Sequence, residues 1–72
     1  MKLSELIIYV PDEGWLELTE EIRGNYKVFL GKCPHKYIQG EVLDYDVLST
    51  EYIKQTKGFD LYSLLIKDYR KG

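Results

Sequence analysis

"WLELTE" at residues 15–20 and "YKVFLGK" at residues 26–32 decide the fold of this 72-residue chain. In the first stretch Leu16 and Leu18 alternate with more polar neighbours, which is the period of a strand with one buried face. In the second stretch Tyr26, Val28 and Leu30 lie on one strand face and Lys27 and Phe29 on the other. "RGN" at residues 23–25 lies between them and is typical of a turn. The two stretches therefore predict a β-hairpin whose loop is longer than two residues.

The segments on either side of this hairpin predict one helix and two more strands. "KLSELIIYVP" places Leu3, Leu6 and Ile7 at helical spacing before Pro11, so we expect a short helix docked on the sheet. "VLSTEYI" at residues 47–53 is rich in residues that favour strands. "DLYSLLIKDYRKG" fits a helix capped by Asp60 or a strand, and we favour the strand because a small sheet needs more strands.

Residues 31–40, "GKCPHKYIQG", predict an irregular crossover with a short helical turn. Gly31 and Pro34 are expected to end the second strand, and Gly40 to end the crossover. Together these segments predict an α+β fold, with a short N-terminal helix packed on a small, mostly antiparallel sheet of about four strands. We expect residues 1–72 to form a single domain.

The composition excludes several classes of protein. A net charge of −2 and a pI near 5.3 are not those of a typical nucleic-acid-binding domain. The basic end, with Lys67, Arg70 and Lys71, keeps nucleic-acid binding as a weaker alternative. No apolar run reaches the roughly 20 residues of a membrane span. One free cysteine and no recognisable leader predict a cytoplasmic protein.

Cys33 and His35 are the first candidates for chemistry, because a thiol and an imidazole can form a nucleophile pair or bind zinc. They lack a second histidine, a C-x-x-C motif and an orienting group, so we expect an ordinary loop thiol beside an imidazole. A zinc ion shared by two copies stays open, since two copies supply four ligands. Otherwise the sequence predicts no metal and no cofactor.

Asp44 and Asp46, with Glu41 close by, are the second candidate group. Paired carboxylates can hold Mg²⁺ or transfer protons. The D-x-D spacing lacks the further ligands and the glycine of a calcium loop, so we expect a solvated turn or strand edge. With neither group complete, the sequence favours a protein that is not an enzyme.

Aromatic residues are the most informative feature for function. Seven tyrosines cannot all fit inside so small a core, and we expect about half of them at the surface. Tyr and Trp are enriched at binding hot spots. Trp15 lies on the more polar strand face and is the anchor candidate, although packing under the helix or a loop would explain it equally well. Glu13 and Glu17 would steer a basic partner, and Tyr37 is a further aromatic contact.

The order of these segments resembles small uncharacterised phage and prophage proteins of Gram-positive bacteria. The residues that carry the resemblance are "KLSELI", "PDEGWLELTE", "YKVFLGK", "EVLDYDVLSTEYI" and "LYSLLIKDY". Such genomes encode compact acidic inhibitors of host proteins, anti-CRISPR proteins among them. The resemblance implies a protein-binding module that modulates or inhibits a host protein by steric occlusion.

Two alternatives to this function stay open. One is a structural protein that buries its tyrosines in a homo-oligomer. The other is a local mimic of DNA phosphates built on the acidic run from Asp12 to Glu21, although a net charge of −2 is far below the charge density of DNA.

Overall fold

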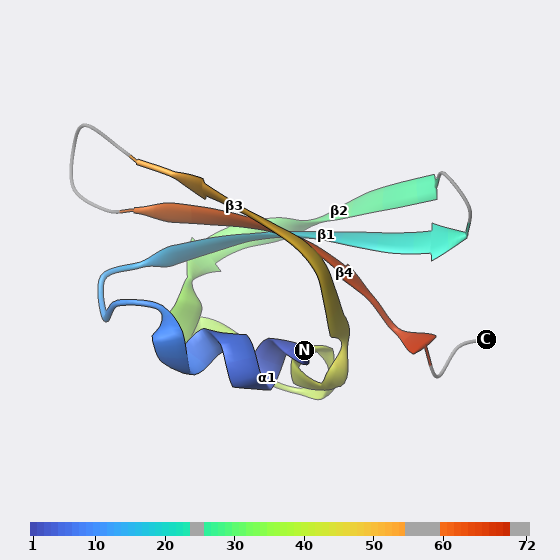
Figure 1. Cartoon of the computed structure of the whole chain (residues 1–72), viewed down its shortest axis with the longest axis horizontal. Coiled ribbons are helices and arrows are strands. Elements are labelled where there is room, and N and C mark those ends of the chain that lie inside the picture. Colours follow the sequence, from blue (N-terminus) through green and yellow to red (C-terminus); the bar gives the residue numbers. More distant parts are fainter. Residues whose placement is uncertain (24–25, 55–59, 70–72) are drawn as a thin grey trace.

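A computed structural model of the chain describes residues 1–23, 26–54 and 60–69. The described residues form one four-stranded mixed sheet with a short helical segment against one face (Figure 1). Two antiparallel hairpins lie side by side, and their inner strands pair in parallel at the centre of the sheet. This confirms the expected α+β fold. The strands, in the spatial order β2-β1-β4-β3, are β1 (Trp15–Arg23), β2 (Tyr26–Pro34), β3 (Asp46–Ile53) and β4 (Leu61–Lys67).

The predicted N-terminal helix is present as α1 (Leu3–Leu6), continued by a 3₁₀ turn η1 (Ile7–Tyr9). The Lys2 backbone N–H donates to Glu5 Oε1 at 3.0 Å, which satisfies a donor at the helix start. A helix this short is marginal by itself. Its stability comes from Leu3, which is 0% exposed, and from Leu6 and Ile7, which pack against the core.

Backbone pairing fixes the position of Leu3. The Leu3 N–H donates to the Tyr45 carbonyl at 2.9 Å, and the Val47 N–H donates to the Met1 carbonyl at 2.8 Å. The first residues of the chain thus lie antiparallel to the start of β3, and Lys2 forms a bridge with Asp46. This short pairing orients the Leu3 side chain toward the sheet.

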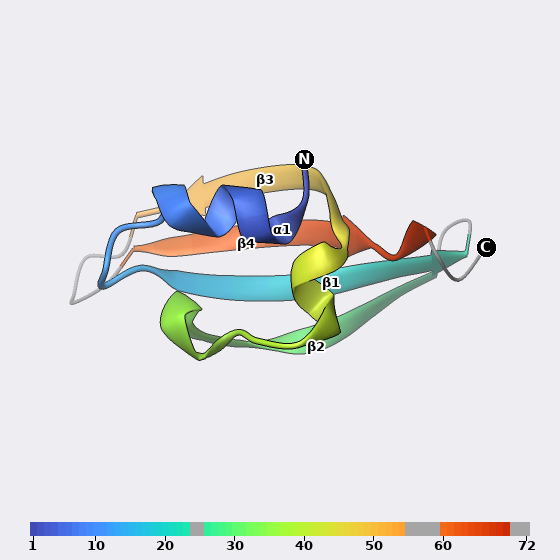
Figure 2. The same ribbon diagram turned by 90° about the horizontal axis from the view of Figure 1, so that it is seen from below.

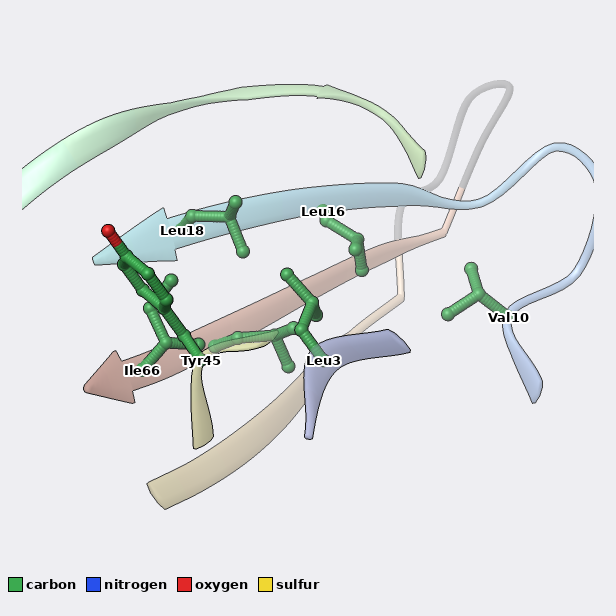
Figure 3. Packing of buried hydrophobic residues seen from close by; sticks show 7 residues of the cluster. Leu3, Val10, Leu16, Leu18, Tyr45 and Ile66 are labelled. Carbon is green, nitrogen blue, oxygen red and sulfur yellow. The ribbon is translucent and has the colours of Figure 1, made fainter. Parts of the chain in front are cut away.

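The core lies between this helical segment and the sheet. Along β1, Leu16 and Leu18 are buried, whereas Trp15, Glu17 and Thr19 are half-buried on the opposite face. The predicted alternation is therefore confirmed. Figure 3 shows these leucines converging with side chains from the helix and from the start of β3. The buried cluster consists of Leu3, Val10, Leu16, Leu18, Tyr45, Leu64 and Ile66.

The first hairpin is tighter than the sequence predicted. β1 and β2 pair as far as Arg23 and Tyr26, so two residues separate the paired ends. The turn residues themselves lie outside the described part of the chain. The extra residue expected in the loop is instead placed within the strands, because the register shifts between Glu21 and Arg23 and again between Leu18 and Thr19.

The crossover from β2 to β3 contains two short 3₁₀ turns, η2 (His35–Tyr37) and η3 (Glu41–Asp44). Gly31 does not end β2 as expected. It continues the strand at a bulge, with a φ of 147°, and Pro34 ends the strand. Gly40 does not end the crossover as expected, because η3 follows it; its φ of 88° is a left-handed conformation that favours glycine. Figure 2 shows η3 and α1 crossing the same side of the sheet.

The ambiguous C-terminal segment is a strand, and the alternative of a helix capped by Asp60 is wrong. β4 pairs with β1 on one side and with β3 on the other, so it is central in the sheet. These two sets of ladder bonds outweigh the helical preference of its leucines. Residues 54–60, "KQTKGFD", have the composition of a turn or loop, and residues 55–59 of this stretch lie outside the described ranges.

Candidate functional site

The face of the sheet opposite α1 carries a second apolar group, separate from the core. Leu61 is 6% exposed, yet it does not belong to the core cluster. Strand register pairs Leu61 with Trp15 on β1 and with Ile53 on β3. Directly paired residues of neighbouring strands point to the same face at about 5 Å between Cβ atoms. We call this group of Trp15, Ile53 and Leu61 the open-face cluster, because no described helix lies over it (Figures 1 and 2).

Trp15 lies at one end of this row of three residues, next to the central Leu61. It is half-buried, and its backbone N–H donates to the Asp60 carbonyl at 2.9 Å, where the parallel β1–β4 pairing begins. On its other side Trp15 pairs with Pro34 of β2. Because Leu16 faces the core, the alternation of β1 turns Trp15 away from α1, and the alternative in which Trp15 packs under the helix is wrong.

Charged residues form the next row along the same face. Ser63 Oγ donates to Glu17 Oε1 at 3.1 Å, which holds the Glu17 carboxylate beside β4. Glu51 of β3 pairs with Ser63, and Lys32 of β2 pairs with Glu17. Glu13 is exposed in the loop that leads into β1. Two carboxylates and one lysine of this row therefore lie next to the open-face cluster, and Glu13 is close to Trp15 in the sequence.

Tyr37 is not brought together with these residues. It belongs to η2, on the connection that returns across the helix-bearing side of the sheet (Figure 2). Its ring is 66% exposed, and Lys36 Nζ lies 5.8 Å from the ring centroid. A cation over an aromatic face at this distance is a favourable contact. Trp15 and Glu17 thus share a surface, whereas Tyr37 belongs to a different one.

The Cys33–His35 pair has a structural explanation. The His35 backbone N–H donates to the Gly14 carbonyl at 3.1 Å, and His35 Nδ1 donates to the same oxygen at 3.0 Å. These two bonds connect the end of β2 to the turn that precedes β1. Cys33 pairs with Leu16 in the sheet and is half-buried. The imidazole therefore closes a backbone junction, and its Nδ1 is engaged with a carbonyl.

The carboxylates Glu41, Asp44 and Asp46 do not converge on one point. Glu41 and Asp44 belong to η3, whereas Asp46 starts β3, pairs with Lys67 and bridges to Lys2. Among residues 1–23, 26–54 and 60–69, no three His, Cys, Asp or Glu side chains are placed to hold a metal ion.

The tyrosines are more exposed than the sequence predicted. Tyr45 is buried at 5% and Tyr62 is half-buried. The other five lie at the surface, namely Tyr9, Tyr26, Tyr37, Tyr52 and Tyr69. The small core explains the difference, since it is filled mainly by leucine and isoleucine side chains.

Two of these tyrosines form a cluster that sequence reasoning missed. The rings of Tyr52 and Tyr62 lie 5.1 Å apart between centroids, tilted by 43°. Desolvation raises the pKa of the Tyr52 phenol above its ordinary value of 10.0, and the hydrogen-bonded Asp60 carboxylate raises it further. The sequence contains no local sign of this ring pair, because Tyr52 and Tyr62 are brought together only by the register of β3 and β4.

A second missed feature is the end of the first hairpin. Along Tyr26–Leu30 of β2 every residue is exposed, including four large apolar ones. The sequence signal was present, because "YKVFL" has apolar residues on both strand faces. A strand with one buried face usually carries polar residues on its solvent-facing side.

The basic C-terminal end is described only in part. Lys67 is half-buried, and its Nζ lies 5.4 Å from the centroid of the Tyr69 ring. Arg70 and Lys71 lie outside the described residues, so the alternative of nucleic-acid binding at this end stays a prediction.

Comparison with protein-family models, curated proteins and solved structures finds no match to this chain. None of the helices in the described residues has the length and apolar character needed to cross a membrane.

Proposed function

We propose that this protein is a small protein-binding module that blocks a functional surface of its partner with the open face of its sheet. The observation that carries the proposal is the open-face cluster, which buries Leu61 outside the core and presents Trp15 on a face without a described helix. A tryptophan side chain beside buried apolar neighbours is a common anchor of a protein interface.

The partner that fits this surface is a folded protein with an apolar contact ringed by basic side chains. Glu17 and Glu51 lie next to the cluster and Glu13 is exposed two residues before Trp15, and complementary charges accelerate the encounter of two proteins. The resemblance to phage proteins favours a host protein in the cytoplasm as this partner. Binding alone would be the mechanism, since a domain seated on a functional surface excludes other ligands by its volume.

Affinity capture from a lysate of a Gram-positive bacterium, followed by binding measurements with the purified partner, tests the proposal. Trp15→Ala should weaken binding by about tenfold or more, as loss of a hot-spot residue does. The matched control is Tyr9→Ala, because Tyr9 is 74% exposed on η1 and away from the open face. Circular dichroism of both variants establishes that they fold.

Full binding by a folded Trp15→Ala variant would remove Trp15 from the interface and overturn the proposal. Glu51→Lys is an independent probe, because Glu51 is exposed on the same face. It should slow association and reduce the dependence of the rate on salt. Association that is indifferent to salt in the unmodified protein would show that the carboxylates do not steer the partner.

A further inference from the structure

The end of the first hairpin projects beyond the core as a two-stranded arm. The parallel pairing of β1 with β4 stops at Glu20 and Ile66, whereas β1 and β2 continue pairing to Arg23 and Tyr26 (Figure 1). We call residues 21–23 and 26–30 the hairpin arm. A hairpin of two strands is marginally stable in water without a sheet or helix against it.

The hairpin arm is also the most apolar exposed part of the described chain. Tyr26 is 77% exposed and Phe29 is 61% exposed, and Ile22, Val28 and Leu30 are each between 43% and 51% exposed. Val28 and Phe29 are neighbours in a strand, so their side chains point to opposite faces. Both faces of the arm therefore present apolar surface to solvent.

β2 is in addition an edge strand, so one row of its backbone N–H and C=O groups has no neighbouring strand. Proteins usually protect such edges with lysine, proline or a bulge. Here the bulge lies at Leu30 and Gly31, and Pro34 ends the strand, so both come after the segment Tyr26–Phe29. Within that segment Lys27 is the one charged residue.

We propose that the hairpin arm is a homodimer interface, in which β2 pairs antiparallel with β2 of a second copy around a two-fold axis at Val28. This register is self-complementary. Val28 lies opposite the second copy's Val28, Lys27 opposite its Phe29, and Tyr26 opposite its Leu30. Each apolar side chain then meets an apolar one or the stem of a lysine, and no two like charges are opposite each other.

Lys27 has an acidic neighbour in its own chain, because strand register pairs it with Glu21 of β1. In the dimer the ammonium group would lie between that carboxylate and the second copy's Phe29 ring, which is a favourable site for a cation. Within Tyr26–Leu30 the self-pairing of β2 therefore places no two like charges directly opposite each other.

The available area also fits a second copy. The five apolar residues of the arm expose roughly 500 Å² of side chain, estimated from their exposed fractions and the size of such residues. A stable dimer buries about 800 Å² per partner, of which about 65% is apolar. The exposed apolar area of the arm is thus of the size that an interface uses, and β2–β2 pairing covers the part of it along β2 while adding main-chain hydrogen bonds. Oligomerisation is a common way to stabilise a domain with so small a core.

Sedimentation of the full chain over a range of concentrations gives the first test. We expect the mass to rise from 8.5 kDa toward twice that value. Val28→Lys would place two ammonium groups opposite each other at the axis and should keep the protein monomeric. Lys32→Glu, also on β2 but beyond the bulge, should leave dimerisation in place.

Cysteine crosslinking tests the register in a Cys33→Ala background. A cysteine at the axis meets its own copy, so Val28→Cys should form an intermolecular disulfide within the usual 4.4–6.8 Å between Cα atoms. Lys32→Cys is the matched control, because it is equally exposed but would lie about 27 Å along the strands from its copy.

A mass that stays at 8.5 kDa at the highest concentration would overturn the proposal, and the arm would then be open to a different protein. Equal crosslinking of Val28→Cys and Lys32→Cys would overturn it as well, because random collisions do not depend on register. Dimerisation does not involve the open-face cluster, so this test is independent of Trp15→Ala.

Discussion

The two faces of the central strands carry similar apolar side chains, but the rest of the chain covers the two faces differently. On the face toward α1, Leu16, Leu64 and Ile66 are at most 1% exposed beneath the helical segment and the crossover. On the opposite face Leu61 is buried beside Trp15, while Leu65 stays half-buried. The strand alternation is the same on both sides, and the difference comes from what the rest of the chain places over each face.

On the open face, apolar side chains are buried only by their neighbours in the sheet, among the described residues. Cross-strand neighbours can cover a residue such as Leu61, but they leave the outer surface of Trp15 and Leu65 accessible. Hydrophobic stabilisation scales with the apolar area removed from water. The covered face should therefore supply most of the stability, and the open face should supply the surface for binding.

The largest expected effect is on the covered face. Leu16→Ala removes a 0% exposed side chain from the core, and such changes cost about 2–5 kcal/mol. A domain of this size has a total stability of about 3–5 kcal/mol, so the variant should be largely unfolded at 25 °C. Urea denaturation followed by circular dichroism measures the loss.

The matched control for that change is Leu65→Ala, the same substitution on the open face of the adjacent strand β4. It should cost clearly less, because Leu65 already contacts solvent. Equal losses from the two substitutions would mean that the two faces contribute alike, and the distinction between them would fail.

Most of the fold could be predicted from the alternation of apolar and polar residues along the strands. Leu16 and Leu18 were placed correctly because the period of two depends on local geometry alone. The C-terminal strand was harder, since Leu61, Leu64 and Leu65 also share a helical face. Its state is decided by ladders to β1 and β3, which lie far away in the sequence. The parallel pairing of β1 with β4 has no local signal at all.

The candidate site was predicted in part for the same reason. Trp15 and Glu17 could be placed on one face, because both belong to β1. Their neighbours Leu61 and Ile53 could not be found, because strand order and register depend on the whole sheet. The role of His35 was also out of reach, since its acceptor Gly14 is 21 residues away.

A smaller effect is expected at the junction that leads into the sheet. His35→Ala removes the bond from Nδ1 to the Gly14 carbonyl, while that oxygen still accepts the backbone N–H of residue 35. Because the acceptor stays satisfied, the cost should be about 1 kcal/mol. Lys36→Ala, at an exposed neighbour, is the control. Indistinguishable urea midpoints for the two variants would show that the imidazole does not hold this junction.

The smallest effect concerns Tyr52, which shares the core-facing side of the sheet with Tyr62 but is 51% exposed. The pKa of its phenol is raised in the folded protein, so folding favours the protonated form. This contribution to stability is complete below the ordinary pKa of 10.0 and is lost as the pH rises through the higher folded pKa. Tyr52→Phe should therefore lose less stability than the unmodified protein as the pH rises above 10.0.

Urea denaturation at several pH values measures that difference, and parallel stability curves would contradict it. Asp60→Asn separates the two causes of the raised pKa. It removes the Asp60 carboxylate, which raises the phenol pKa through its hydrogen bond and its charge, but keeps the desolvation, which is the largest single cause, and the neighbouring Tyr62. The phenol pKa in this variant, followed by ultraviolet absorbance, should fall toward but not reach 10.0. A full return to the ordinary value would mean that partial burial beside Tyr62 contributes nothing, and that this end of the sheet is as open as the face around Trp15.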